Sequence, residues 1–524
     1  MEENLMEKIV ALAKRRGFIY PGSEIYGGLT GTWDYGPLGV LLKQNIKSEW
    51  WRSIVQLRDD VVGIDASIMM NPEVWRASGH VEAFTDPLVE CMNCHSRFRV
   101  DHLVKNPKKL EQFQEKIMDF IEEGINQDKL EFSKIENYLK TIDYLQQSNS
   151  NDKDRVIKQI TDEADKTRDE IKKRIKTREK FLIETVGESF KNYGPLIQYY
   201  LNTSERCPDC GHSFWTKPKK FNLLVKAYLG VVEGEQSEVF LRGEITQGAF
   251  VNFENVVSST RVKIPFGIAQ IGKAFRNEIT PGNFTYRSRE FEQMELEFFI
   301  RPDESEGNKW FDYWKNERLN WYKSLGLNPD KLRFRKHEDT ERAHYAKSAE
   351  DIEYETPFGW SEFEGIHNRG DWDLSRHKLG YIDETGAKFT PWVIEASGGV
   401  DRSALSFLID SYSEIGDRVI LKLHPKLAPY KVAVFPLLGN KPELIDKAKS
   451  IYESLKPHFM TAWDDRGNIG KRYLSQDEAG TPWCVTVDFE TLENDSVTIR
   501  DRDTAKQERV KISEIAAYIS KKLK

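Results

Sequence analysis

The chain lacks both of the common glycine-rich sequences that bind phosphate. No Gly-x-x-x-x-Gly-Lys-Ser/Thr loop and no Gly-x-Gly-x-x-Gly fingerprint occurs in its 524 residues. Both patterns place backbone N–H groups around a phosphate at the start of a helix. A nucleotide site of the P-loop or dinucleotide-binding type is therefore excluded, and any ATP site must hold its phosphates with side chains.

The chain also has few cysteines, no long apolar run and no strong net charge. Five cysteines do not make a disulfide framework, so we expect a reducing, cytoplasmic location. No run approaches the roughly 20 apolar residues that cross a bilayer, and residues 1–16 predict an amphipathic helix instead of a cleavable apolar segment, so no membrane partner is expected. The net charge of -7 gives no overall nucleic-acid footprint, although a local basic stripe would suffice.

Apolar and aromatic residues are abundant. They make up 39% and 12% of the chain, which indicates folded cores and not disorder. A chain of this length is expected to hold about two to four domains.

Two arginine-bearing segments, far apart in the sequence, carry the side chains that a phosphate clamp needs. Residues 275–278 read Phe-Arg-Asn-Glu and precede Arg287 and Phe291, whereas residues 395–402 read Glu-Ala-Ser-Gly-Gly-Val-Asp-Arg. Guanidinium groups bind phosphate bidentately and stay charged at any working pH, and an aromatic ring can stack on a base. The segments predict one shared nucleoside triphosphate site. The alternative for isolated arginines is a surface ion pair.

Hydrophobic periodicity predicts the elements around these segments. Apolar residues at every fourth position predict a helix over 38–57, directly after Pro37. Residues 61–70 read as the strand that follows, closed by Asn71-Pro72. Further elements are expected at residues 307–325 (helix), 392–395 (strand) and 400–412 (helix).

Residues 239–300 read as strand-rich, and their last part has two different faces. From 291 to 299 the odd positions carry carboxylates, an amide and two aromatics, whereas the even positions from 294 to 300 are apolar. Successive side chains of a strand point to opposite faces. One face should therefore pack on a core and the other should line a site.

Residues 105–192 have a different composition, rich in Lys, Glu, Asp and Gln and poor in Gly and Pro. They predict a helical insertion, with the tip of a hairpin near residues 146–152. A solvated, charged hairpin is the plainer interpretation, and contact with a nucleic-acid backbone is the alternative.

The end of the chain predicts a small α/β domain beyond the proline-containing segment 423–429, because strands and helices alternate there. Strands are expected at 432–435, 483–489 and 496–500, and helices at 441–455 and from 513. Cys484 lies in an apolar strand and is expected to be a buried thiol.

Two Cys-x-x-Cys pairs supply the four thiolates of a tetrahedral structural zinc site. They are Cys91 with Cys94 and Cys207 with Cys210. Their separation exceeds the usual 15–20 residues, but the insertion lies between them and its two ends must meet where it leaves the rest of the protein. Four reduced cysteines without metal, or ligation by His95 or His212, remain alternatives.

Several segments, in order along the chain, resemble the homodimeric glycyl-tRNA synthetases, which are class II aminoacyl-tRNA synthetases. These are residues 27–39, the helix and strand that end at Pro72 (motif 1), residues 275–295 (motif 2), residues 395–402 (motif 3), residues 343–346 and residues 481–489. The chain departs from the family pattern at Gly243, Gly282 and Ala396.

The resemblance implies an α+β fold. It consists of a class II antiparallel-sheet catalytic domain, a helical zinc-containing insertion and a C-terminal α/β anticodon-binding domain. The expected divisions are 1–90 (core with motif 1), 91–215 (insertion), 216–424 (core with motifs 2 and 3) and 425–524 (anticodon-binding domain). Residues 500–504, Arg-Asp-Arg-Asp-Thr, would then present donors and acceptors to unpaired bases, unless they form a plain charged turn.

The implied reaction is ATP-dependent attachment of glycine to tRNA(Gly) through a glycyl-adenylate. Arg276, expected to be catalytic, would hold the α-phosphate and the glycine carboxylate. Arg402, also expected to be catalytic, would hold the γ-phosphate with Arg287. Mg²⁺ would bind Glu362. The ATP set implied by the resemblance is Arg276, Asn277, Glu278, Tyr286, Arg287, Phe291, Glu362, Phe363, Gly399, Val400, Asp401 and Arg402.

The same resemblance assigns Glu244, Glu295, Glu395 and Ser397 to the amino group of glycine and places Arg99 beside them. The full glycine set is Arg99, Glu244, Phe291, Glu292, Gln293, Met294, Glu295, Glu395, Ser397 and Gly399. A rigid wall would exclude any larger side chain, and no smaller amino acid exists, so no editing domain is expected.

Two other functions share this fold. A non-catalytic accessory protein would have lost the motif arginines, which are present here. A synthetase for another amino acid is disfavoured by the carboxylates at 244, 295 and 395. The expected partners are glycine, ATP, tRNA(Gly) and a second copy of the chain, because the motif 1 helix is expected to expose tryptophans and aliphatic residues.

Overall fold

The computed structural model describes residues 3–103, 205–232, 236–337, 346–416 and 418–523. The chain forms two compact units, Met1–Val81 with Leu224–Lys524 and Glu82–Leu223. The helical insertion expected at 105–192 and most of the segment 343–346 lie outside the described residues.

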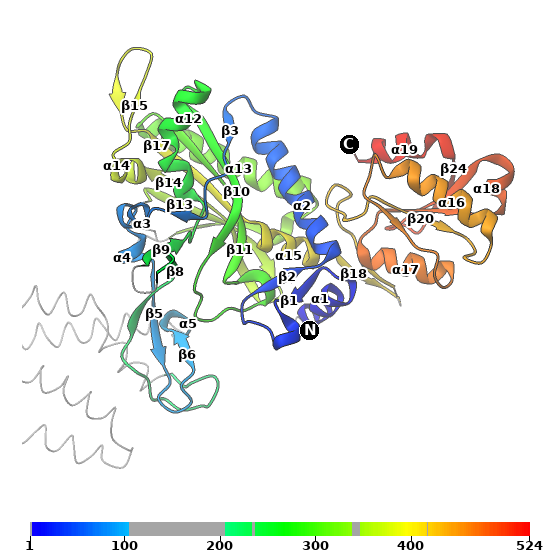
Figure 1. The fold of residues 1–524 in the computed structure, drawn as a ribbon, viewed down its shortest axis with the longest axis horizontal. Coiled ribbons are helices and arrows are strands. Elements are labelled where there is room, and N and C mark those ends of the chain that lie inside the picture. The colour runs from blue at the N-terminus through cyan, green and yellow to red at the C-terminus, as the bar shows by residue number, and fades with distance from the viewer. Residues whose placement is uncertain (1–2, 104–204, 233–235, 338–345, 417, 524) are drawn as a thin grey trace, which may run out of the picture. The chain divides into compact units, whose positions relative to one another are not determined.

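A seven-stranded sheet forms the centre of the larger unit (Figure 1). Its order is β12-β13-β14-β17-β11-β10-β3, and all neighbours are antiparallel except β10 and β3. This sheet confirms the antiparallel catalytic domain predicted from the sequence. In that order the strands are Leu332–Lys336, Ser348–Thr356, Gly359–Gly370, Trp392–Gly399, Glu290–Ile300, Phe266–Phe275 and Val61–Gly63.

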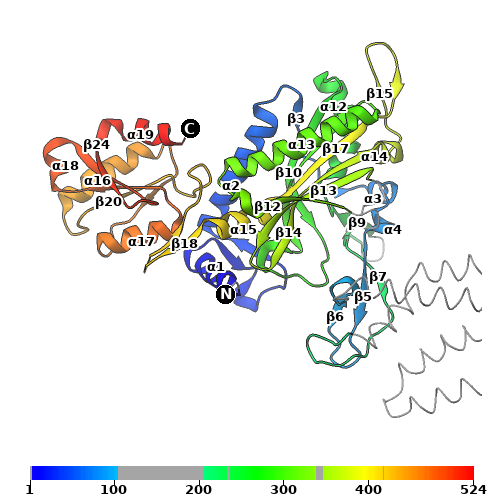
Figure 2. The same cartoon turned by 180° about the vertical axis from the view of Figure 1, so that it is seen from behind.

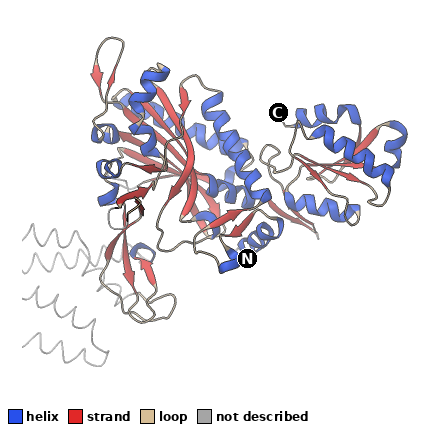
Figure 3. Ribbon diagram, viewed as in Figure 1, coloured by secondary structure: helices blue, strands red, loops and turns tan. Residues whose placement is uncertain are grey.

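The alternation predicted for β11 gives this sheet two different faces. The even residues Met294, Leu296, Phe298 and Ile300 are fully buried in a core with α13 (Glu304–Ser324) and α15 (Val400–Ser411). On the other face, Phe299 packs against α11 (Thr246–Val251) and α12 (Phe253–Thr260). Figure 3 shows helices on both faces. Helices α11 and α12 pack near Phe299, at one end of the second face, so Phe291, Gln293 and Glu295 are left to line a site.

The segment before the sheet differs in part from the prediction. Helix α2 spans Pro37–Trp51, and a π-helical turn, Arg52–Gln56, carries the apolar stripe on to Ile54. The single strand expected over 61–70 is wrong. It divides into β3, which pairs with β10, and β4 (Met69–Met70), which pairs with β9 (Ser237–Leu241) in a separate three-stranded sheet with β8 (Val225–Leu229). The change of partner breaks the strand.

Residues 239–300 are also less strand-rich than predicted, because α11 and α12 separate β9 from β10. Shorter elements complete this region: α1 (Glu3–Arg16), β1 (Ile19–Pro21), β2 (Trp33–Tyr35), α3 (Pro72–Ala77), α4 (His80–Ala83), α14 (Trp372–Arg376), β15 (Tyr381–Ile382), β16 (Lys388–Phe389), β18 (Tyr412–Ile415) and β19 (Arg418–Leu421).

The C-terminal part forms the predicted α/β domain, labelled β20 to α19 in Figure 2. Its sheet has the order β21-β20-β22-β23-β24 and consists of Thr461–Trp463, Val432–Pro436, Trp483–Val487, Ser496–Asp501 and Gln507–Lys511. Helices α16 (Pro442–Leu455) and α19 (Ile515–Lys522) pack on one face, and α17 (Ile469–Ala479) packs on the other, over the buried Cys484. The predicted strand 483–489 ends earlier, where α18 (Phe489–Asn494) begins.

Arg500 near the end of β23 and Arg502 just after it both bind groups of their own domain. Arg500 binds Asp477 through two hydrogen bonds of 2.9 and 3.1 Å, and Arg502 donates to the carbonyl of Gly480. Both arginines are buried. Both guanidinium groups therefore bind inside the domain, and contact of residues 500–504 with unpaired bases stays a prediction.

The smaller unit holds a three-stranded sheet, β6-β5-β7, made of Arg97–Arg99, Thr85–Glu90 and Lys219–Asn222. The short helix α5 (Val100–Leu103) packs with Trp215 and two of the cysteines in a small core. Within the described ranges of both units, no helix is long and apolar enough to cross a membrane.

Candidate active site

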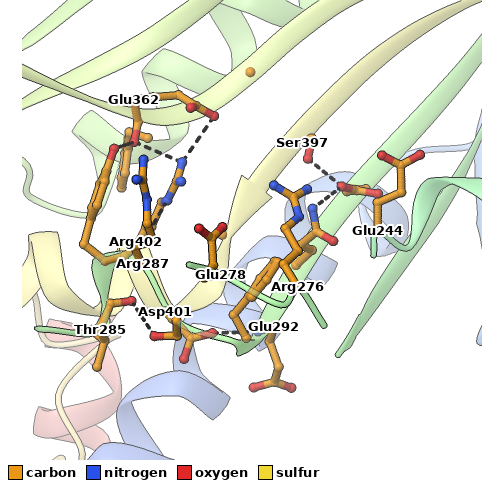
Figure 4. Close-up of a pocket in the computed structure, with 18 of the residues that line it drawn as sticks. Glu244, Arg276, Glu278, Thr285, Arg287, Glu292, Glu362, Ser397, Asp401 and Arg402 are labelled. Carbon is orange, nitrogen blue, oxygen red and sulfur yellow. Dashed lines mark hydrogen bonds and ion pairs between the residues drawn. The ribbon is translucent and has the colours of Figure 1, made fainter. Parts of the chain in front are cut away.

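A polar cleft opens on the face of the sheet that α13 and α15 leave free. Arg276 and Arg402 line the same cleft, as predicted from the two separate segments. In Figure 4, Arg287, Arg402 and Glu362 gather at one end, and Glu244 and Ser397 lie at the other. The lining residues are Glu244, Arg276, Glu278, Thr285, Tyr286, Arg287, Ser288, Phe291, Glu292, Gln293, Glu295, Glu362, Phe363, Gly365, His367, Glu395, Ser397, Gly399, Asp401 and Arg402.

Strand register brings the side chains at one end together. Ser397 of β17 lies opposite Glu295 of β11, and on its other side it lies opposite Gly365 of β14. One row further, Glu395 lies between Glu297 and His367 in the same way. Directly opposite residues on one sheet face are about 5 Å apart. Three strands therefore bring Glu295, Glu395 and Ser397 together, and Glu244 joins them from the loop between β9 and α11.

At the other end, Arg402 is already held in place. Its guanidinium lies 4.5 Å from the ring centre of Tyr286, and its Nη1 lies 3.2 Å from Glu362 Oε1. Arg402 lowers the pKa of Glu362, because the positive charge stabilises the carboxylate. The end is thus built from fixed cations and one ionised carboxylate, which suits a phosphate chain with a divalent cation.

A buried lysine supports the start of α15. Lys43 of α2 donates to Asp401 at 2.8 Å and also pairs with Glu292 at 2.8 Å. The other oxygen of Asp401 accepts from the backbone N–H of Glu292 at 2.6 Å. Helix α2, β11 and α15 are therefore joined directly behind Arg402, and the motif 1 and motif 3 segments share one ion-pair network.

The opposite end is a cluster of carboxylates. Glu295 accepts from Ser397 and Thr246 at 2.5 Å each, and from the side chain of Gln293 at 2.7 Å. Burial, with Glu395 and Glu244 close by, raises the pKa of Glu295 to about 7. For Glu244 the opposite holds: burial alone would raise its pKa, but His80 and Arg369 lower it well below its usual range. This end carries negative charge in excess of its counter-charges, which suits an ammonium group.

Most of the predicted residues of the larger unit line the cleft, but three side chains do not. Met294 and Val400 are completely buried in the core on the other side of the sheet, because strand alternation and the position of α15 turn their side chains away, and Asn277 is exposed. Arg99 belongs to the smaller unit, where it binds Asp86 at 2.6 Å. Glu292 lines the cleft, but its carboxylate is held by Lys43 and Lys47.

Two aromatic rings of the cleft contact arginine side chains. Phe291 lies beside Arg276, at 5.4 Å from ring centre to guanidinium carbon, whereas Arg402 lies on Tyr286. Phe291 and Arg402 therefore each have their own partner in this structure.

Sequence reasoning did not identify the buried polar residues behind the carboxylates. His367 and Arg369 of β14 both bind Glu395, and Arg369 also binds Asp373. The signal was present, since His367 and Arg369 alternate with Ile366 and Asn368 as site-facing strand residues do. Nothing in that segment alone identifies Glu395 as the partner.

The four predicted cysteines meet in the smaller unit. Their sulfur atoms all lie within 4.8 Å of one another, and the pairs Cys91–Cys210 and Cys94–Cys207 are 3.6 Å apart. Zinc bonded to four sulfurs at about 2.3 Å requires sulfur–sulfur distances of about 3.8 Å, so the thiols fit a tetrahedral zinc ion.

Both Cys-x-x-Cys segments form the same kind of turn. The residues after them, His95 and Gly211, have φ angles of 60° and 75° and donate their N–H groups back to the first cysteine at 2.9 and 2.8 Å. The side chain of His95 instead pairs with Glu90, and that of His212 bonds to a backbone carbonyl. The histidines predicted as alternative ligands are therefore outside the sulfur cluster.

Comparisons with known proteins agree with this geometry. Residues 231–412 match the family described as tRNA synthetase class II core domain (G, H, P, S and T), and residues 431–522 match the anticodon binding domain. A prolyl-tRNA synthetase structure from Cryptosporidium parvum covers 98% of this chain, and this chain covers 76% of it, with a TM-score of 0.57 at 13% identity. That likeness shows the fold.

Curated relatives match over their whole length. A glycine--tRNA ligase of Alkaliphilus oremlandii is 44% identical, covering 100% of this chain and 99% of its own. One from Caldanaerobacter subterraneus is 46% identical over 99% of this chain and 98% of its own. One from Geobacillus thermodenitrificans is 44% identical over 99% and 97%. The chain belongs to the glycine--tRNA ligase family of class II aminoacyl-tRNA synthetases.

Proposed function

We propose that this protein attaches glycine to tRNA(Gly) in two steps, using ATP. In the first step a carboxylate oxygen of glycine attacks the α-phosphorus of ATP, and the bond to pyrophosphate breaks. In the second step the ribose hydroxyl at the 3′ end of the tRNA attacks the glycyl carbonyl, and AMP leaves. The observation that carries the proposal is the shared cleft of Arg276 and Arg402, with an anionic pocket at its far end.

The cationic end suits the triphosphate. Arg402 and Arg287 bind the γ-phosphate, and Arg276 holds the α-phosphate and the glycine carboxylate. Phosphoryl transfer depends mainly on positioning and on neutralising charge, which fixed guanidinium groups supply without a side-chain base. Glu278 accepts from the adenine amino group, and Phe291 stacks on the ring.

A divalent cation also belongs in this region. Glu362, which the neighbouring Arg402 keeps ionised, is the residue that would hold Mg²⁺ with the phosphates. When bound, the ion would neutralise charge on the phosphate oxygens.

The anionic end suits the ammonium group of glycine. Glu244, Glu295 and Glu395 supply the charge, and Ser397, which donates to Glu295, fixes its direction. Because Glu295, Glu395 and Ser397 lie on paired strands, this wall is rigid, and a β-carbon would have to displace it.

Zinc and a second subunit complete the proposal. The four cysteines hold a structural zinc ion that fixes the two ends of the chain entering and leaving residues 95–206.

The protein is a homodimer, and the exposed apolar side chains of α2 and the turn after it, Val40 (53% exposed), Trp51 (36%) and Leu57 (63%), face the partner. Trp50, predicted as a second exposed tryptophan, is buried.

Residues 425–524 bind the anticodon of tRNA(Gly), which the family match to residues 431–522 supports.

Amino-acid-dependent exchange of labelled pyrophosphate into ATP tests the first step, and charging of tRNA(Gly) transcript tests the second. Glycine alone among the amino acids should support exchange. Exchange with serine or proline but not glycine would point to another specificity, and no exchange with any amino acid would point to an accessory protein. Sedimentation at nanomolar concentration tests the dimer, which an active monomer would disprove.

A further inference from the structure

Both oxygens of Glu395 are held by cationic side chains of the neighbouring strand. His367 Nδ1 lies 2.6 Å from Oε2, and Arg369 Nη1 donates to Oε1 at 3.0 Å. His367 and Arg369 are two residues apart on β14, so their side chains lie on the face that carries the cleft. The carboxylate of Glu395 is therefore fixed at two points.

Arg369 is itself anchored behind the cleft. It makes a two-point ion pair with Asp373, through hydrogen bonds of 2.7 and 3.0 Å, and the side chains of both residues are about 1% exposed. Asp373 also accepts from the side chain of Gln247 at 3.0 Å, and the same side-chain nitrogen of Gln247 lies 3.2 Å from Glu244. A continuous hydrogen-bonded chain thus runs from Glu395 to Glu244.

The neighbouring Glu297 is also buried, but its surroundings differ from those of Glu395. It lies directly opposite Glu395 in the sheet and is almost fully buried, yet neither of its carboxyl oxygens has a hydrogen-bond partner among the described residues. Burial and the charge of Glu395 raise the pKa of Glu297 well above its usual value, which favours its neutral form. Burial would raise the pKa of Glu395 too, but Arg369 and His367 lower it. These two side chains therefore favour the ionised form of Glu395.

We propose that His367 and Arg369 are positioning residues for glycine: they fix the carboxylate of Glu395 toward the ammonium group, and Asp373 and Gln247 extend the same constraint to Glu244. The proposal rests on the proposed function, since it assigns these residues to one end of that site. Both bind Glu395, a group assigned to glycine, so their removal should affect the binding of glycine more than the binding of ATP.

The test measures pyrophosphate exchange by His367→Leu and His367→Asn in the full-length protein. Leucine fills similar space without a donor, whereas asparagine places an N–H near the position of Nδ1. A hydrogen bond to a charged group contributes about 1.5–3 kcal/mol, which corresponds to about 10- to 100-fold. His367→Leu should therefore raise the KM for glycine by at least about tenfold, with the KM for ATP changed less than about twofold. His367→Asn should recover most of the loss.

Arg318→Lys is the matched control. Arg318 forms an equally buried ion pair with Glu364 of β14, at 2.6 Å, but neither residue lines the cleft. This variant should lower the midpoint of thermal unfolding without changing the ratio of the two KM values.

Each outcome decides one question. An unchanged KM for glycine in His367→Leu, an equal rise in both KM values, or no recovery in His367→Asn would overturn the positioning role. If the unaltered protein showed no exchange with glycine, the proposed function itself would fail. Arg369→Lys gives an independent measurement, because a lysine cannot bridge Glu395 and Asp373 with the same geometry; its KM for glycine should rise, and a normal value would count against the proposal.

Discussion

Arg402 should be far more important for activity than for stability. In the described structure it makes a ring contact with Tyr286 at 4.5 Å and an ion pair with Glu362 at 3.2 Å. Glu362 has a half-exposed side chain, so the ion pair contributes at most about 1 kcal/mol, and the ring contact adds about 0.5–1 kcal/mol. Arg402 also donates to the backbone carbonyls of Tyr286 and Glu362 at 3.3 Å each, and such bonds contribute about 0.5–1.5 kcal/mol each, so Arg402→Ala should lower the free energy of unfolding by about 2–4 kcal/mol.

The effect on exchange should be much larger. Fixed arginines that neutralise charge in phosphoryl transfer contribute about 10³- to 10⁵-fold to the rate, and each factor of ten corresponds to about 1.4 kcal/mol. Arg402→Ala should reduce glycine-dependent pyrophosphate exchange by at least about 10³-fold. Arg402→Lys should recover little, because an ammonium group provides neither the planar stack nor two-point phosphate binding.

Arg58→Ala provides the control for this experiment. Arg58 has the same kinds of contact, an ion pair with Asp60 at 2.8 Å and a ring contact with Trp314 at 4.5 Å, but it does not line the cleft. Its loss should lower stability by a similar amount and leave exchange within about twofold. If Arg402→Ala retained exchange within about tenfold of the unaltered protein, the assignment of this end of the cleft to phosphate would be refuted.

Five more predictions concern other residues of the protein. The pKa of Glu295 is raised to about 7, so the KM for glycine should increase as the pH falls from 8 to 6; a flat profile would argue against a charged contact. The same raised pKa also makes the free energy of unfolding depend on pH. The contribution of Glu295 to stability is present below pH 4.5, the ordinary pKa of a glutamate, and is lost as the pH rises to about 7. Glu295→Gln should therefore reduce the slope of the free energy of unfolding against pH in chemical denaturation. Metal analysis should find about one zinc ion per chain, and Cys207→Ser should lower the zinc content and the unfolding midpoint together; zinc-free protein with an unchanged midpoint would contradict the site. Gly365→Ala places a Cβ 2.7 Å from the imidazole Cε1 of His367, so it should raise the KM for glycine more than the KM for ATP in exchange kinetics. Phe298→Ala removes a fully buried ring that packs on Trp310 and Trp314, and chemical denaturation should show a loss of about 3–5 kcal/mol.

The sequence predicted those parts of the fold whose signal is local. The alternation in β11 identified both of its faces, and the two arginine segments were correctly placed in one cleft. The periodicity of α2 was equally informative, because a helix buries residues at fixed intervals regardless of what lies opposite. For β11 and α2 the deciding pattern repeats within a few residues of sequence, whereas the two arginine segments were joined through the shared phosphate-binding chemistry of their side chains.

The errors have the opposite cause. Residues 61–70 have the composition of one strand, but two different partner strands divide them. The sequence predicted that Arg500 and Arg502 lie at the surface. In the structure Arg500 forms a buried ion pair with Asp477, and Arg502 donates a hydrogen bond to the carbonyl of Gly480. The role of His367 depends on which residue of β17 lies opposite it. These outcomes depend on pairing between distant segments, which a single sequence does not state.

One face of β11 lines the pocket and the other packs in the core, and this has a consequence for any change in the amino acid that the family accepts. Its odd positions carry the pocket and its even positions carry the core, so an insertion or deletion of one residue would exchange the two and destroy recognition and folding together. Substitutions at 293 and 295 leave the packed face untouched. Selection can therefore alter the pocket one residue at a time, whereas the length of this strand is constrained by both tasks at once.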